Sequence, residues 1–335
     1  MRRVHPASAS AQRGAALLLA MIVVALIATA ASGMVWQQTR AVSVEAAQRA
    51  REDAAWILNG ALDWARLILR EDLRASSQRG AAPYDSLDEP WAQPLAEARL
   101  SSFLAADKDN NADSGPEAFI SGAIEDAQAR YNLRNLLNST DPKLLEQQIG
   151  ALQQLATAAG APSDAAARIA LALRASKPVP PGSGGPNAPQ QNPAALPIPP
   201  QRLSDLAWQG IEAATLTRLE PYVDLLPKAT PINLNTAPRE VILAAIDGID
   251  QGTAQRLVAA RQRKPFQSLA DVEAQLTPPM KTDDKRVSVN SSFFLVSGRL
   301  RLDDRVLEER SLLERQNNRV DVLRREKRSF SAPLR

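Results

Sequence analysis

A long uncharged stretch near the N-terminus constrains this chain more than any other feature of its sequence. Residues 15–39 contain no charged side chain, and the run from Ala15 to Trp36 is apolar or small. An α-helix rises ~1.5 Å per residue, so about 20 apolar residues cross the hydrocarbon core of a bilayer. The sequence therefore predicts a membrane-spanning helix over residues 15–36.

Basic residues precede this span. Arg2, Arg3 and Arg13 lie among the first 14 residues, which contain no acid. The positive-inside rule then leaves the N-terminus in the cytoplasm and places the rest of the chain across the membrane. A secretory signal peptide, cut near the small residues 28–32, is the alternative interpretation.

Composition disfavours most enzyme classes. The chain has no cysteine, and its one histidine, His5, precedes the span. Thiol chemistry and histidine catalysis beyond the span are therefore excluded, and no paired-carboxylate motif stands out. The three leader arginines account for the whole net charge of +3. A balanced remainder does not favour nucleic-acid binding, and we expect a structural or binding protein.

The span should continue into an amphipathic helix. Residues 40–74 contain no proline and one glycine, Gly60. Leu58, Leu62, Ala65 and Leu69 recur at helical spacing and share one face. We expect this apolar stripe to pack on a sheet.

Alternating oxygen-bearing side chains suggest a calcium loop in the middle of the chain. The sixth position of that loop is Ala112 and the twelfth is Ala118, where a calcium loop has Gly and Glu. A polar surface turn is the alternative. The candidate calcium ligands are Asp107, Asp109, Asn111 and Asp113.

The next part of the chain reads as helical. Residues 141–174 should be helical with a break at 160–162, and nine prolines make residues 178–200 an extended linker or surface loop. Residues 231–272 read as a helix-hairpin-helix, with Asn235 or Thr236 capping its first helix, a turn at 248–252 and a second helix at 253–263.

The hairpin carries an acid where DNA-binding versions have a second glycine. Asp250 would repel a phosphate, and residues 228–271 contain six basic and four acidic residues. We therefore expect this segment to contact protein. The alternative is a membrane-anchored DNA-binding protein of the competence type, which salt-dependent DNA binding would reveal.

Strands flank the helical region. Phe119, Ile120 and Ile124 predict a strand interrupted at Gly122. Further strands are expected at 286–302, 305–315 and 319–327. The helices would then form an insertion in a sheet.

The leader resembles that of type IV prepilins. Gln12-Arg13-Gly14 stands directly before the apolar run. The resemblance implies that a prepilin peptidase cuts between Gly14 and Ala15 and methylates the new N-terminus. Leu19 is then the fifth mature residue, where most pilin-like proteins have Glu.

A second motif resembles that of one pilin-like family. Asp126 in the expected strand precedes a Gln-x-Arg-aromatic-Asn-Leu-x-x-Leu run over residues 128–136. With the leader and the helix-hairpin-helix, it covers most of the chain. The sequence is identified as similar to general secretion pathway protein K, the K-type minor pseudopilin of the type II secretion system.

This resemblance implies an α+β fold, in which a long pilin-like N-terminal helix packs on an antiparallel sheet. A large α-helical domain of the helix-hairpin-helix or SAM-like kind would be inserted in that sheet. The implied parts are a leader at 1–14, a transmembrane helix at 15–36, pilin-like parts at 37–140 and 286–335, and the insert at 141–285.

The implied function is to cap the tip of a periplasmic pseudopilus that drives folded proteins through the outer membrane, without catalysis. The protein would sit in the bacterial inner membrane by a single pass. Its implied partners are the I-, J- and H-type minor pseudopilins, the major pseudopilin, the prepilin peptidase, the inner-membrane platform and the exoproteins.

Overall fold

A computed structural model describes residues 10–78, 83–100, 118–138, 141–177, 197–302 and 305–331. The chain divides into two compact units, Met1–Asn59 and Gly60–Arg335. The long helix α1, Ser10–Gln78, begins in the first unit and ends in the second. By its length and composition, α1 can cross a membrane.

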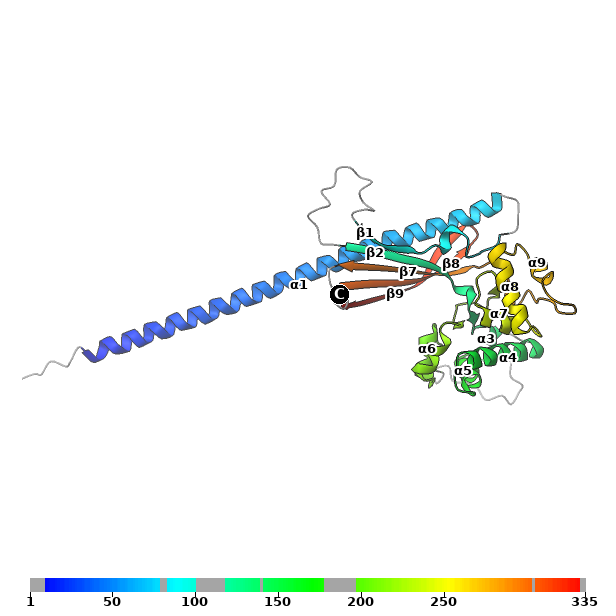
Figure 1. Cartoon of the computed structure of the whole chain (residues 1–335). Coiled ribbons are helices and arrows are strands. Elements are labelled where there is room, and N and C mark those ends of the chain that lie inside the picture. Colours follow the sequence, from blue (N-terminus) through cyan, green and yellow to red (C-terminus); the bar gives the residue numbers. More distant parts are fainter. Residues whose placement is uncertain are drawn as a thin grey trace, which may run out of the picture. The chain divides into compact units, whose positions relative to one another are not determined.

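The predicted apolar stripe of α1 is confirmed. Leu58, Leu62, Ala65 and Leu69 are all buried. Leu62, Ala65 and Leu69 belong to one core cluster with Phe294, Val296, Leu313 and Val320 of the sheet. The helical spacing of these residues therefore places one face of α1 on the sheet (Figure 1).

The sheet has five antiparallel strands in the order β1-β2-β7-β8-β9. Their bounds are Leu95–Arg99, Ala118–Asp126, Phe293–Leu302, Arg305–Gln316 and Arg319–Ser331. Asn317 and Asn318 have φ of 50° and 63°, which suits the tight turn between β8 and β9. The strands expected at both ends of the helical region are thus confirmed.

The expected interruption at Gly122 is wrong. β2 pairs with β7 without a break from Ala118 to Asp126. A Cβ added at Gly122 would lie 2.8 Å from the carbonyl oxygen of Ser297 on β7. Glycine is needed there because the neighbouring backbone leaves no room for a side chain.

The helices between β2 and β7 form a block with its own core (Figure 1). A short 3-10 turn, η3 (Ala127–Ala129), and α3 (Asn135–Asn138) open the block, followed by α4 (Pro142–Ala158) and α5 (Ala165–Ala175). Gly160, with φ of 63°, follows the end of α4, so the expected break is confirmed. The remaining elements of the block are η5 (Leu203–Gln209), α6 (Ala213–Leu219), α7 (Arg239–Ala245), α8 (Gln251–Arg263) and α9 (Leu269–Glu273).

Two short parallel strand pairs lie outside the main sheet. β3 (Tyr131–Asn132) pairs with β4 (Val223–Asp224), and β5 (Ile232–Asn233) pairs with β6 (Val287–Ser288). A 3-10 turn, η1 (Pro90–Ala92), precedes β1. Its Trp91 is buried against Phe294 with ring centroids 5.2 Å apart.

Candidate functional site

The residues expected at the cleavage position lie near the start of α1. Gly14 is within the helix, Ala15 is exposed, and Leu19 is 67 % exposed one turn further along. The apolar residues that follow, through Trp36, are exposed in the same way. Among described residues, this part of α1 therefore presents an apolar surface on all sides, as a helix in lipid does.

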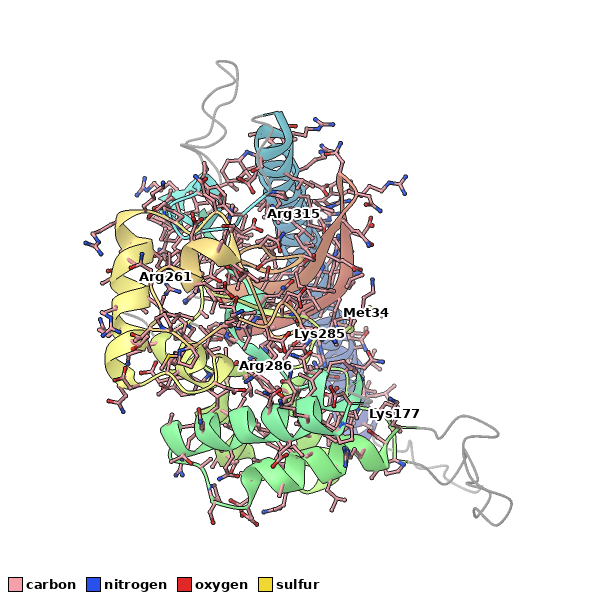
Figure 2. The ribbon with its side chains drawn as sticks, turned by 90° about the vertical axis from the view of Figure 1, so that its right-hand side faces the viewer. Met34, Lys177, Arg261, Lys285, Arg286 and Arg315 are labelled. Atoms are coloured by element: carbon pink, nitrogen blue, oxygen red, sulfur yellow. The ribbon has the colours of Figure 1, made fainter. Side chains whose placement is uncertain are left out.

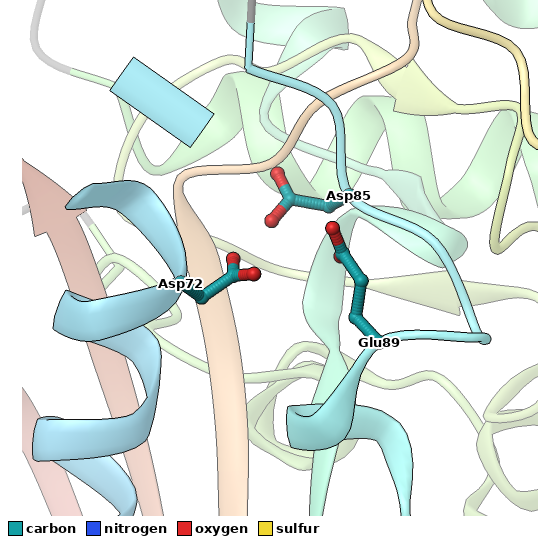
Figure 3. A group of neighbouring side chains, drawn as sticks. All are labelled: Asp72, Asp85 and Glu89. Carbon is teal, nitrogen blue, oxygen red and sulfur yellow. The ribbon is translucent and has the colours of Figure 1, made fainter. Parts of the chain in front are cut away.

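The calcium ligands expected at 107–113 lie outside the described residues. The structure instead brings together another acidic group, Asp72 of α1 with Asp85 and Glu89 of the loop before η1. Figure 3 shows the three carboxylates pointing toward one another. One oxygen from each lies within 4.8 Å of the others.

Arg315 supplies a positive charge to this acidic group. It is buried at the end of β8 (Figure 2), where Nη1 donates to Asp72 Oδ2 at 2.9 Å and Nη2 donates to Asp85 Oδ1. The guanidinium also lies over the Phe294 ring, 4.7 Å from its centroid. Three carboxylates and one guanidinium still leave an excess of negative charge.

Burial raises the pKa of two of these carboxyls, Asp85 and Glu89. The pKa of Asp85 is raised because burial outweighs the attraction of Arg315. Burial, aided by the charges of Asp72 and Asp85, raises the pKa of Glu89 to about 7. Its Oε2 accepts hydrogen bonds from Ser86 N at 2.9 Å and Trp91 Nε1 at 2.8 Å. The group can therefore hold a proton near neutral pH.

The second motif begins at a buried carboxylate that joins the sheet to the helical block. Asp126 ends β2, and its Oδ2 accepts from Asn233 Nδ2 at 2.9 Å, Thr236 Oγ1 at 2.6 Å and Ser291 Oγ at 2.7 Å. Burial raises the pKa of Asp126 to about 6, although these hydrogen bonds oppose the rise. Three donors from two segments, 233–236 and Ser291, thus converge on one side chain.

The rest of the motif makes the connection continuous. Gln128 donates to Pro231 O at 3.0 Å and accepts from Ser292 N at 2.7 Å. Asn132 donates to Lys228 O at 2.6 Å and accepts from Leu226 N at 3.1 Å. Leu133 and Leu136 lie in the core of the block. The motif therefore joins the sheet to the helical block. Its polar side chains satisfy buried backbone groups that would otherwise need water.

The helix-hairpin-helix expectation needs one correction. Neither Asn235 nor Thr236 caps the first helix: Pro238 is at the N-cap of α7, without a side-chain cap. Asn235 instead donates to Phe266 O at 2.9 Å, and Thr236 donates to Asp126. Both side chains are used for tertiary contacts, which the local pattern does not contain.

Asp250 has a structural role in the hairpin. It is the N-cap of α8, and its Oδ1 accepts from Thr253 N at 2.7 Å. Gly248, with φ of 79°, makes the turn before it. Arg261 of α8 is directed inward and donates to Leu234 O at 2.6 Å (Figure 2). The hairpin presents a carboxylate at the helix end, where a phosphate-binding hairpin needs free N–H groups.

Taken together, a long helix that is exposed and apolar in its first part and packed by one face on an antiparallel sheet in its last part, with a helical insert, defines a pilin-like protein whose apolar N-terminal helix is suited to a membrane anchor. Two family models, both described as type II secretion system protein K, match residues 129–228 and 232–290. The chain belongs to the family of type II secretion system protein K.

Relatives align over nearly the whole chain. The type II secretion system protein K of Pseudomonas aeruginosa is 28 % identical, covering 96 % of this chain and 95 % of the relative. The corresponding protein of Pectobacterium carotovorum is 28 % identical over 95 % of this chain and 97 % of its own length. Their membership in a secretion apparatus agrees with the expected non-enzymatic role.

A solved structure shares the fold. One chain in the crystal structure of the GspK–GspI–GspJ complex from the type II secretion system of enterotoxigenic Escherichia coli matches with a TM-score of 0.60. The match covers 84 % of this chain and 98 % of that one, at 19 % identity. The expected α+β fold, with its long helix, sheet and helical insert, is confirmed.

Proposed function

We propose that this protein is a minor pseudopilin that caps the tip of the pseudopilus of a type II secretion system. The observation that carries the proposal is α1, which is apolar on all sides in its first part and amphipathic in its last part. Such a helix anchors a subunit in the membrane and, after extraction, in the helical core of a fibre. The family membership supports the same role.

The anchor sets the location. The span over 15–36 would lie in the bacterial inner membrane, with Arg2, Arg3 and Arg13 on the cytoplasmic side. Cleavage after Gly14 and methylation of Ala15 follow from the leader. The part of the chain beyond Trp36 would then lie in the periplasm, with the insert at 141–285 between the pilin-like parts at 37–140 and 286–335.

The partners would be I- and J-type minor pseudopilins, because the similar solved chain was crystallised with both. A suitable contact face lies on α1. Gly60, Trp64 and Leu67 are exposed, and Trp64 is 55 % exposed. They sit opposite the buried Leu62, Ala65 and Leu69, and Trp56 continues the same helical face one turn earlier. Exposed tryptophans around a glycine suit a second helix.

Co-purification of the processed chain with I- and J-type pseudopilins tests this proposal. Trp64→Asp should reduce recovery of the complex severalfold, because an acid would replace an apolar contact. Trp208→Asp is the matched control, since Trp208 is 75 % exposed on η5, away from α1. Failure of the unaltered chain to recover either partner, or equal losses from both variants, would contradict the proposal.

Calcium binding at Asp107, Asp109, Asn111 and Asp113 remains part of the proposal. Alternating oxygen ligands support it, as they do in known calcium loops. Millimolar calcium should raise the melting temperature, and Asp109→Ala should abolish the rise, while Asp72→Asn should retain it. Stabilisation lost only in the Asp72 variant would move the ion to the acidic group on α1.

A further inference from the structure

The strand β9 forms a free edge of the main sheet. It is 13 residues long and pairs with β8 on one side only. Among the described residues, no other backbone segment bonds to the backbone of β9, although Arg66 Nε of α1 donates to Val320 O at 2.9 Å near the start of the strand. A long open edge offers N–H and C=O groups to a further strand.

The edge is strongly basic. Between Arg319 and Ser331 the strand contains five basic residues, at 319, 324, 325, 327 and 328, and two acids, Asp321 and Glu326. Natural edges often contain charges that prevent unwanted pairing. The same charges attract a strand of opposite charge, so the edge discriminates between partners.

A cleft opens beside this edge. It has a volume of about 410 Å³ and lies between the sheet and the elements η5 and α6 of the helical block. Leu295 and Leu312 of the sheet line it together with Leu203 and Leu216 of the block. β9 contributes Arg324, Glu326 and Arg328. The cleft thus combines apolar surface with charge along an open strand.

The arginines of the cleft are not equally engaged. Arg324 is 3.0 Å from Glu326 and donates to Gln201 O at 2.8 Å. Arg310 is 3.5 Å from the exposed Glu220. Arg328 is exposed and has no hydrogen bond or ion pair with any described residue. Its guanidinium is available to an incoming carboxylate.

We propose that β9 binds an acidic, extended segment of another protein as a sixth strand, with some of its side chains entering the cleft. Backbone hydrogen bonds along the edge would provide affinity, and carboxylates beside Arg328 and Arg310 would provide selectivity. A second copy of this chain is a poor occupant, because two β9 strands would each contribute a charge of the same sign. The site is independent of the tip assignment.

Direct binding tests this site on the full processed chain in detergent micelles. The probe is a fluorescein-labelled nine-residue peptide of alternating Val and Glu. Its binding is measured by fluorescence anisotropy. Two control peptides accompany it, one N-methylated at alternate residues and one with Lys in place of Glu. The Val-Glu peptide should bind and should slow amide hydrogen exchange in β9, whereas both controls should fail.

A charge-reversed variant separates selectivity from non-specific attraction. Arg328→Glu should weaken binding of the Val-Glu peptide roughly three- to tenfold, because one attraction becomes a repulsion. Arg263→Glu makes the same change on the exposed surface of α8 and should leave binding unchanged. Equal binding of the N-methylated peptide, equal weakening by both variants, or no binding with unprotected β9 amides would overturn the proposal.

Discussion

Arg315 Nη1 lies 2.9 Å from Asp72 Oδ2, so the end of β8 is bonded to the last turns of α1. The same guanidinium donates to the buried Asp85 and to Ser291 O at 3.1 Å. One side chain therefore ties the long helix, the loop before η1 and the segment that enters β7.

Replacing Arg315 should destabilise the protein strongly. Arg315→Met removes the cation and leaves the buried Asp85 and the half-buried Asp72 without compensation, which should cost about 3–5 kcal/mol. Urea unfolding in detergent measures the loss. Arg315→Lys keeps the charge but not the forked geometry of the guanidinium. The stability of this variant should therefore lie between that of the unaltered protein and that of Arg315→Met. If Arg315→Met lowers the free energy of unfolding by less than about 1 kcal/mol, the carboxyls of Asp72 and Asp85 are protonated in the variant and the prediction is wrong.

The acidic group should make stability depend on pH. The pKa of Glu89 is about 7 in the folded protein against an ordinary value of 4.5, so folding favours its protonated form. The stabilisation from protonation is complete below about pH 4.5 and is lost as the pH rises through about 7.

Glu89→Gln should therefore flatten this dependence. The amide oxygen can still accept from Ser86 N and Trp91 Nε1, and no charge is buried. We expect about 1–2 kcal/mol of stabilisation at pH 8, reduced for partial exposure, and little change at pH 4. Thermal unfolding at both values checks this. A variant that loses stability equally at pH 4 and pH 8 would contradict it.

Gly122 should not accept a side chain. Gly122→Ala places a Cβ 2.8 Å from Ser297 O, and the two strands must separate. We expect a loss of about 1–3 kcal/mol by chemical denaturation. Gly150→Ala in α4 is the control, because nothing lies within 4 Å of its Cβ. It should stabilise the chain by about 0.5–1 kcal/mol. Equal effects would rule out the steric explanation.

Processing should depend on Gly14. Co-expression with a prepilin peptidase should yield a chain that starts at a methylated Ala15. Gly14→Glu should abolish cleavage, because the resemblance implies that the peptidase needs a minimal side chain before the cut. Mass spectrometry of the N-terminus checks both results. A new N-terminus near Ser32 would instead identify a signal peptidase.

Leu19 at the fifth mature position favours a place at the end of the fibre. A Glu at the fifth mature position is thought to pair with the amine of a neighbouring subunit, and Leu19 cannot do so. Leu19→Glu should leave cleavage after Gly14 intact. Secretion should not need a Glu at this position. Labelling should detect one copy per fibre, at the tip. Fibres made of this subunit alone, or labels along the whole fibre, would refute the assignment.

Local signals in the sequence predicted much of the fold. The spacing of Leu58, Leu62, Ala65 and Leu69 identified the buried face of α1, because helical periodicity needs only neighbouring residues. The leader and the motif that begins at Asp126 predicted the family. The same local logic failed at Gly122, where the deciding atom belongs to Ser297, far away in the sequence.

The polar contacts could not be predicted in this way. Arg315 and Asp85 are separated by 230 positions, and nothing in either segment identifies the other as its partner. Asn235 and Thr236 fit a helix cap by type, yet tertiary hydrogen bonds use both. Trp64 could have been recognised, since an aromatic residue on the charged face of an amphipathic helix indicates a contact surface.

The register of β2 and β7 has a consequence for how such a protein can vary. Asp126 and Phe294 are paired across adjacent strands, so the chain leaves the sheet and returns one strand away. A tight turn in place of residues 127–292 would leave a continuous antiparallel meander of five strands. The helical block is thus an insertion whose size can change without altering any strand pairing of the five-stranded sheet. In this chain the whole helical block lies between β2 and β7, so the pairing of these two strands is the long-range step in forming the sheet.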